Sequence, residues 1–165
     1  MDLKQTYNRI AEDWHGDHKQ DTWWIDGADK FVAFLKPGDL VLDAGCGTGI
    51  KSKYLISKGL KVIGIDFSEK MIEIARREVP GGEFQVTDIQ GAVELASNFN
   101  GIFLHAALLH IKKSLAGGVL QKLLGKLKKR IRLKTHGFLK RSAVVLNRRR
   151  SRGRKSLTVK IHSKG

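Results

Sequence analysis

The fold of this chain is decided by the stretch Val41-Leu42-Asp43-Ala44-Gly45-Cys46-Gly47-Thr48-Gly49. The stretch begins as a short apolar run, which indicates a buried strand, and passes through an acid into glycines at every second position. Glycine has no Cβ, so it adopts positive φ at low cost and lets a ligand lie against bare peptide. The stretch therefore predicts a strand that ends in a tight loop, with the next helix aimed at a ligand.

A second acid stands at the end of the next apolar run. Asp66 lies 17 residues beyond Gly49, which leaves room for one helix, a stop at Gly59 and a second strand. A carboxylate at that strand end can accept both hydroxyl hydrogens of a ribose. The competing interpretation is a tight strand–helix turn followed by a solvated acid. The strand, the spacing and the acid together favour an α/β domain that binds a nucleoside.

Two features of the loop argue against a nicotinamide or flavin dinucleotide. The glycine spacing is G-x-G-x-G, and Ile50 stands where the dinucleotide pattern G-x-G-x-x-G has its last glycine. Asp43 also precedes the first glycine by two residues. A carboxylate there would repel an anionic pyrophosphate and would attract a cationic amino group.

Four segments in this order resemble the class I S-adenosylmethionine-dependent methyltransferases of the small, stand-alone bacterial or archaeal type. They are residues 41–49, 62–72, 84–89 and 99–111, and the second contains the family pattern D-x-S-x-x-M. The resemblance covers a little under half of the chain. It departs from the family at Asn100, where the family usually has Asp.

The resemblance implies S-adenosyl-L-methionine as the cofactor and gives roles to the matching residues. The glycine loop passes beneath the cofactor, Asp43 attracts its amino group directly or through water, and Asp66 binds the ribose hydroxyls. Phe67 and Met71 cover the adenine, and Asp88 accepts from its exocyclic amine. The full predicted set is Asp43, Gly45, Cys46, Gly47, Gly49, Asp66, Phe67, Met71, Asp88, Ile89, His105, Tyr7 and Trp14.

The remaining members of this set have more specific expectations. The backbone of Ile89 serves a ring nitrogen of the adenine, and His105 borders the methionine arm. Tyr7 and Trp14 belong to a lid over the reacting methyl group. Cys46 fills a small position in the loop, because a lone cysteine cannot build a disulfide or a thiolate metal site.

The chemistry that the resemblance implies is in-line displacement at a sulfonium carbon, so positioning and the exclusion of water supply most of the acceleration. A general base is needed only if the acceptor must lose a proton early. His15 and His110 are the candidates, and each also has a structural or solvent-exposed interpretation; no residue is assigned as catalytic. The six histidines are too scattered to predict a metal site.

The alternation of elements predicts an α/β, Rossmann-like, mostly parallel sheet with helices on both faces and incomplete or irregular C-terminal strands. The expected strands cover residues 40–44, 61–65, 83–87 and 101–105, with 143–146 and 157–161 as weaker candidates. The expected helices cover most of 4–36 and residues 50–58, 68–78, 91–97 and 115–127. Residues 1–125 are predicted to form the cofactor-binding domain, with 1–36 as its helical lid, and 126–165 a basic tail.

Charge divides the chain more sharply than hydropathy. The net charge is +15, yet all 16 acids lie at or before Glu94, and residues 95–165 hold 19 of the 31 Lys and Arg. Residues 126–165 have three competing interpretations. They could form an extension that binds nucleic acid without sequence preference, or a tail that is only solvated. They could also be the product of a reading-frame slip near residues 112–130. The coding DNA in its other frames would decide the third.

The length and composition of the chain limit the class of protein that it can be. At 165 residues the chain can build one real core. It has no apolar run near the roughly 20 residues that span a bilayer, and its first residues lack a secretion signal, so a cytoplasmic protein without a membrane partner is expected. The predicted partner is a small-molecule methyl acceptor. Two alternatives stay open. The chain could be an RNA methyltransferase that binds its substrate through the basic tail, or an inactive remnant of the fold.

Overall fold

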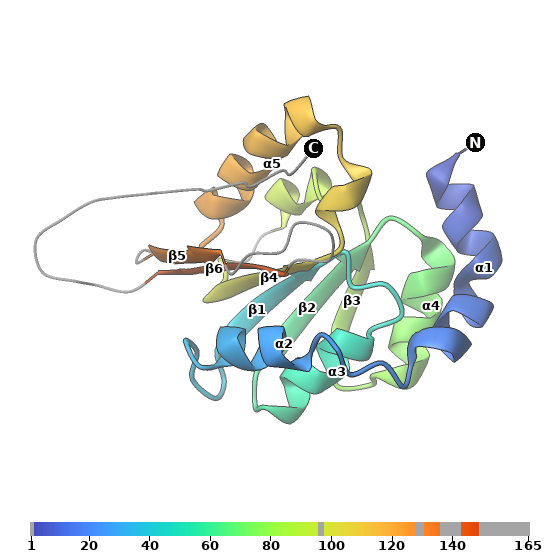
Figure 1. Cartoon of the computed structure of the whole chain (residues 1–165), viewed down its shortest axis with the longest axis horizontal. Coiled ribbons are helices and arrows are strands. Elements are labelled where there is room, and N and C mark those ends of the chain that lie inside the picture. The colour runs from blue at the N-terminus through green and yellow to red at the C-terminus, as the bar shows by residue number, and fades with distance from the viewer. Residues whose placement is uncertain (1, 96–97, 128–130, 136–142, 149–165) are drawn as a thin grey trace, which may run out of the picture.

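The centre of the molecule is a six-stranded sheet. A computed structural model of the chain describes residues 2–95, 98–127, 131–135 and 143–148. The strand order is β3-β2-β1-β4-β6-β5 (Figure 1). The strands are β1 (Leu40–Ala44), β2 (Lys61–Asp66), β3 (Glu83–Val86), β4 (Gly101–His105), β5 (Ile131–Thr135) and β6 (Ala143–Arg148). The first four run parallel, and β6 is antiparallel to both β4 and β5.

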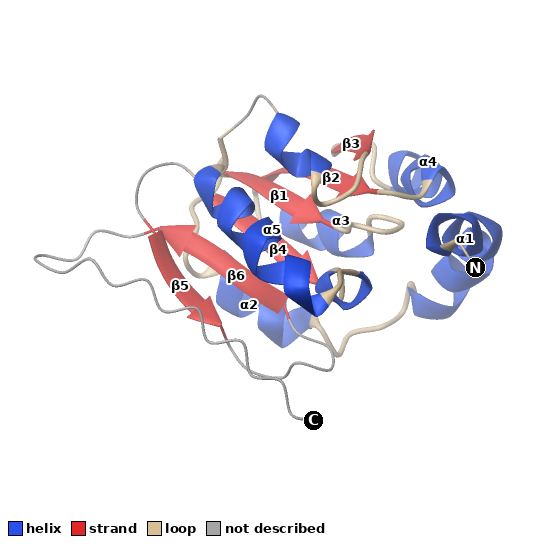
Figure 2. Ribbon diagram, turned by 90° about the horizontal axis from the view of Figure 1, so that it is seen from above, coloured by secondary structure: helices blue, strands red, loops and turns tan. Residues whose placement is uncertain are grey.

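Helices cover both faces of this sheet, as predicted. The elements are α1 (Leu3–His18), α2 (Ile25–Val32), α3 (Ile50–Ser57), α4 (Glu69–Glu78), α5 (Lys113–Gly125) and the 3-10 turns η1 (Gly91–Glu94) and η2 (Leu108–His110). Figure 1 shows α5 on one face of the sheet and α2 and α3 on the other. Seen from above, α1 lies beside α4 at the side of the sheet where β3 is (Figure 2). The α/β, Rossmann-like class predicted from the sequence is confirmed.

The core follows from the two-residue period of the strands. Leu42 and Ala44 of β1 pack into the apolar cluster beneath α5. Val41, which points the other way, packs with Phe31 of α2 and Phe103 of β4. Because both faces of β1 are covered, its sequence is a nearly continuous apolar run, which is typical of a central parallel strand.

Two polar side chains fix the ends of the core elements. Ser68 is the N-cap of α4, and its hydroxyl accepts a hydrogen bond from the Met71 amide at 3.2 Å. Asn100 accepts from the Leu40 amide at 3.0 Å through its side-chain oxygen. An amide oxygen can accept this bond as a carboxylate would, so the departure from the family at this position is compatible with the start of β1.

The C-terminal strands are irregular in the way that the sequence suggested. Residues 143–146 pair beside β4, with Ile102 opposite Leu146, and the strand extends to Arg148. The sequence did not predict β5, which pairs with β6 at the sheet edge. The helix expected over 91–97 is only the short turn η1. The expected strand over 157–161 lies outside the described residues.

Candidate cofactor site

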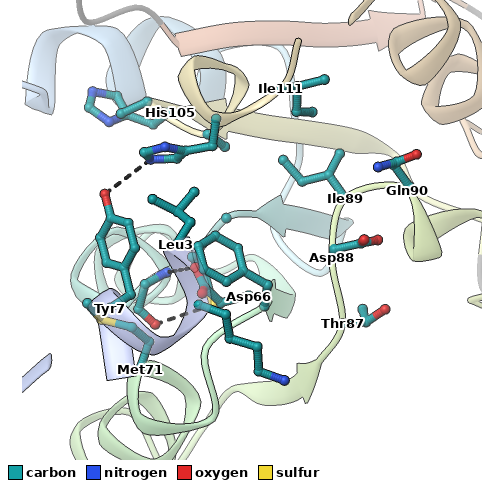
Figure 3. Close-up of a pocket in the computed structure, with 18 of the residues that line it drawn as sticks. Leu3, Tyr7, Asp66, Met71, Thr87, Asp88, Ile89, Gln90, His105 and Ile111 are labelled. Carbon is teal, nitrogen blue, oxygen red and sulfur yellow. Dashed lines mark hydrogen bonds between the residues drawn. The ribbon is translucent and has the colours of Figure 1, made fainter. Parts of the chain in front are cut away.

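A cavity of about 360 Å³ lies at the carboxyl ends of the parallel strands. Open α/β sheets bind ligands at this edge, where neighbouring strands lead to opposite faces. Loops that follow β1, β2, β3 and β4 line it, and α1 closes one side (Figure 3). Every residue predicted to bind the cofactor lines this cavity except Asp43 and Gly49.

The glycine loop lies directly against the segment that follows β4. Gly45 has φ +79°, and a Cβ at this position would stand 2.5 Å from the Ala107 Cβ. No other residue fits without displacing the backbone, so this side of the cavity is lined by bare peptide. Gly49 also has positive φ, but its close neighbours are Val79 and Ala75 of the α4 region. Gly49 therefore allows α3 to pack on α4 and does not itself line the cavity, and its place beneath the cofactor stays a prediction.

Asp66 ends β2 with its carboxylate already oriented. Its two oxygens accept from the Gly47 amide at 3.0 Å and from the Ser68 amide at 2.9 Å. The side chain is 8% exposed, and burial raises its pKa, while the two amide donors oppose that rise. These bonds tie the glycine loop to the end of β2 and leave lone pairs of the carboxylate for a ligand.

Asp43 is more deeply placed than the sequence indicated. It is 1% exposed, does not line the cavity, and accepts a hydrogen bond of 2.6 Å from the Ser52 hydroxyl. Burial raises its pKa to about 6, against the opposing effects of Ser52 and of the nearby Lys51 ammonium. Any attraction that Asp43 exerts on a ligand must therefore act through the loop rather than by direct contact.

An aromatic group from three elements forms the wall beside α1. The Tyr7 hydroxyl lies 3.1 Å from Nε2 of His110, and the Tyr7 ring meets the Phe67 ring edge-on at 5.6 Å (Figure 3). Burial, followed by the charge of Asp66, raises the pKa of Tyr7. The phenol therefore stays protonated at neutral pH and can donate or accept a hydrogen bond inside the cavity.

The two histidines considered as general bases lie in different places. His110 lines the main cavity. His15 instead contacts the Thr48 hydroxyl at 2.9 Å, with Glu78 at 4.0 Å from its other ring nitrogen, and it lines a second cavity on the far side of the loop. His15 thus links α1 to the loop and to α4. Trp14, on the same helix, reaches the main cavity with its ring stacked on His18 at 4.3 Å.

The far end of the cavity follows β3. Asp88 and Ile89 both line it, and Asp88 accepts from the Gly91 amide at 2.6 Å, which holds the turn before η1. Sequence reasoning missed several lining residues: Asp2, Leu3, Lys4, Lys51, Thr87, Gln90, Ala106, Ala107 and Ile111. A signal existed for Lys51, which follows the glycine loop directly in the first turn of α3. The side chains of α1 could not be placed without its packing on α4.

His105 is the last residue of β4, and its side chain lies in an unusual environment. It is 7% exposed, and its Nδ1 has no hydrogen-bond partner among the described residues. Burial first, and then the charge of Lys51, lower its pKa to about 4. The imidazole is therefore neutral at physiological pH.

This environment predicts how His105 titrates. In a two-dimensional NMR titration, its ring signals should stay constant between about pH 5.5 and 8, where an ordinary histidine changes charge. They should shift only near pH 4, toward the pKa of about 4. Lys51→Met should raise that midpoint, because it removes a repelling charge, while Lys53→Met on the same helix should leave it in place. A midpoint above 6 in the unmodified protein would contradict this environment.

The described residues contain neither a group of metal ligands nor a membrane-spanning helix. No three His, Cys, Asp or Glu side chains gather as metal ligands in the described part of the chain. No helix of the described ranges is both long and apolar enough to cross a membrane.

The comparisons with known proteins agree with this geometry. A protein family described as "Methyltransferase domain" matches residues 41–130. The chain is 27% identical over 122 residues to a demethylmenaquinone methyltransferase of Symbiobacterium thermophilum, which covers 66% of this chain and 49% of that protein. It is 37% identical over 83 residues to phosphoethanolamine N-methyltransferase 1 of Arabidopsis thaliana, over 47% of this chain and 17% of that protein.

A solved structure shows the same fold. The magnesium protoporphyrin IX methyltransferase of Synechocystis PCC 6803, crystallised with bound S-adenosylmethionine, superposes with a TM-score of 0.64 at 21% identity. The match covers 87% of this chain and 93% of that one. The chain belongs to the methyltransferase-domain family of class I, S-adenosylmethionine-dependent enzymes. It spans about half, or less, of the length of the curated relatives named above.

Proposed function

We propose that this chain transfers the methyl group of S-adenosyl-L-methionine to a small-molecule acceptor. The observation that carries the proposal is the oriented carboxylate of Asp66 beside the bare glycine loop, in one cavity with Asp88 and Tyr7. The family match supports the same cofactor.

The residues of the cavity fit this cofactor. Asp66 offers free lone pairs to a ribose diol, and Asp88 offers an acceptor for an exocyclic amine. Phe67 and Met71 supply apolar surface between the two, and Gly45 and Gly47 of the loop line the same cavity. A dinucleotide fits poorly, because the negative charges of Asp66 at the cavity and of the buried Asp43 behind the loop disfavour an anionic pyrophosphate.

When bound, the cofactor supplies a methyl group on a positively charged sulfur, which leaves as a neutral thioether once the acceptor has attacked the methyl carbon. The chain's own contribution is to position the acceptor against the methyl group and to exclude water from the cavity. Tyr7, Trp14 and Phe67 are apolar on most of their surface, and α1 carries the first two over the cavity mouth. A reacting acceptor would meet these rings in place of water.

The Tyr7–His110 pair is the proposed route for a proton. An acceptor hydroxyl or amine that loses its proton during attack needs a base within hydrogen-bond reach. The Tyr7 hydroxyl faces the cavity and lies 3.1 Å from His110 Nε2. The phenol can orient the acceptor while His110 takes the proton, either directly or through Tyr7. This contact is the reason to prefer His110 over His15.

The methyl acceptor is proposed only as a small molecule, without a more specific chemical class. The named relatives act, by their names, on demethylmenaquinone, phosphoethanolamine and magnesium protoporphyrin IX, which share little chemistry. Nucleic-acid contact through the basic tail 126–165 stays a prediction, since residues 128–130, 136–142 and 149–165 of that tail lie outside the described residues.

Calorimetry tests the cofactor proposal. S-adenosylhomocysteine should bind at one site per chain, because it keeps the nucleoside and the amino-acid arm that the cavity fits. NAD, tested in parallel as the matched control, should bind far more weakly or not at all, because the negative charges of Asp66 and of the buried Asp43 disfavour its pyrophosphate. Tighter binding of NAD than of S-adenosylhomocysteine would overturn the assignment.

A further inference from the structure

Asn8 of α1 forms hydrogen bonds with three consecutive residues at the start of α4. Its Oδ1 atom accepts from the Ser68 hydroxyl at 2.6 Å and from the Lys70 amide at 3.2 Å. Its Nδ2 atom donates to the Glu69 carboxylate at 2.9 Å. A side-chain amide both accepts and donates, so asparagine matches the two donors and the one acceptor that this turn presents.

The first turn of α4 is therefore capped from two elements. The Ser68 hydroxyl accepts from the Met71 amide at 3.2 Å and passes its own proton to Asn8. The first amides of a helix have no partner inside the helix, and Asn8 supplies an acceptor for one of them, that of Lys70, from α1. Ser68 is fully buried. If α1 moved away, this hydroxyl would lose its acceptor where water cannot easily replace it.

The same serine holds the carboxylate that the proposed function assigns to the ribose. The Ser68 amide donates to one oxygen of Asp66 at 2.9 Å, and the Gly47 amide donates to the other at 3.0 Å. A continuous chain of hydrogen bonds thus runs from Asn8 through Ser68 and Asp66 to the glycine loop. Only Phe67 separates the serine from the aspartate, so a displacement of Ser68 also displaces the carboxylate.

The other contacts of α1 with the α4 region separate into two kinds. Tyr7, the neighbour of Asn8, meets the Phe67 ring edge-on at 5.6 Å, so two adjacent residues of α1 hold the short segment after β2. Glu12 pairs instead with Arg77 in the last turn of α4, and both side chains are exposed. This ion pair joins the same two helices, which lie side by side in Figure 2, without a link to Asp66.

We propose that Asn8 is a positioning residue that couples the docking of α1 to the orientation of Asp66. The docked helix fixes Ser68, and Ser68 fixes the carboxylate. Coupling between two equilibria is reciprocal, so a bound cofactor in turn stabilises the docked helix over the cavity. The proposal rests on the proposed function, because it takes Asp66 as the residue that binds the ribose.

Calorimetry with S-adenosylhomocysteine tests the coupling in three variants, each also made in the Asp66→Ala background. Asn8→Leu removes both the acceptor and the donor at similar size. Asn8→Asp keeps an acceptor oxygen for the Ser68 hydroxyl and the Lys70 amide. Glu12→Ala is the control, because it removes the exposed ion pair between the two helices and leaves the chain of hydrogen bonds in place.

If Asn8 acts through Asp66, Asn8→Leu should weaken binding by about tenfold, because the buried Ser68 hydroxyl is left without its acceptor. In the Asp66→Ala background the same change should matter by less than about twofold, since the carboxylate that it positions is gone. Asn8→Asp should bind within about threefold of the unmodified chain. Glu12→Ala should change the affinity by less than about twofold in either background.

A second measurement needs no ligand. Hydrogen exchange of backbone amides, followed by NMR in the cofactor-free chain, reports how firmly Asp66 holds its two donors. Asn8→Leu should speed exchange at the Gly47 and Ser68 amides. Asn8→Asp and Glu12→Ala should leave both amides at their normal rates.

Several results would overturn the coupling. Asn8→Leu could leave the affinity unchanged, or weaken it equally with and without Asp66 and speed exchange only within α1, which would make Asn8 a simple fastener of that helix. Asn8→Asp could bind as weakly as Asn8→Leu, which would show that the acceptor oxygen does not matter. A failure of the proposed function looks different. The unmodified chain would then not bind S-adenosylhomocysteine, while the exchange result in the cofactor-free chain would stand.

Discussion

Asp66→Ala should weaken the binding of S-adenosylhomocysteine by about 1.5–3 kcal/mol, which is roughly 10- to 150-fold. Two losses add up in this variant. The ribose hydroxyls lose a charged acceptor, and the Gly47 and Ser68 amides lose the bonds of 3.0 Å and 2.9 Å that hold the loop in its binding shape. Calorimetry at neutral pH measures the change directly.

Two further variants separate these contributions. Asp66→Asn keeps one oxygen for an amide donor but loses the charge, so its affinity should fall between that of the unmodified chain and that of Asp66→Ala. Glu73→Ala is the control, because Glu73 is an exposed carboxylate on α4 that pairs with Lys70 outside the cavity. An Asp66→Ala protein that is folded by circular dichroism and binds S-adenosylhomocysteine within twofold of normal would show that Asp66 is only a structural brace.

Asp43→Asn should stabilise the cofactor-free protein above about pH 6 by up to about 3 kcal/mol. Burial raises the pKa of Asp43 from 3.8 to about 6, so the folded state takes up a proton more readily than the unfolded chain. The penalty for burying the charge is absent below pH 3.8 and complete above pH 6. Stability attributable to Asp43 therefore falls as pH rises through this window. The Ser52 hydroxyl can still donate to the amide oxygen of Asn.

Urea unfolding at a series of pH values from about 4 to 7 measures this difference. Other carboxylates also change the stability of the unmodified chain with pH, so the informative quantity is the difference between the two proteins. That difference should grow from near zero at low pH to its full size above pH 6, while the exposed control Glu73→Gln shows no such growth. The same variant should bind S-adenosylhomocysteine more weakly, because the amino group loses an attracting charge. A constant or reversed difference would contradict a buried, charged Asp43.

The glycine loop and Asp66 could be predicted from the sequence because they combine two local signals. An apolar run that ends in alternating glycines has few physical uses, and the distance from Gly49 to Asp66 admits one helix and one strand. The sequence also predicted the parallel core from β1 to β4, since the two-residue period of a strand acts over a few residues.

The C-terminal edge of the sheet could be predicted from the sequence only in part. The apolar run at 143–146 was the best candidate for a strand beside β4, and that pairing is confirmed, but nothing local indicated its antiparallel direction or that β5 would lie beyond it. Strand pairing joins residues far apart in sequence, so a charge-rich segment gives little information about its partner.

The sequence by itself determined the fold class, the family and the ends of the strands on which the cavity is built. Only the tertiary structure decided which side chains face that cavity. It turned Gly49 toward Val79 and Asp43 toward Ser52, and it brought Tyr7 to His110 across 103 positions of sequence. The physical reason is that local propensity acts over a few residues, whereas burial, charge pairing and access to a cavity depend on elements that meet only when the chain is folded.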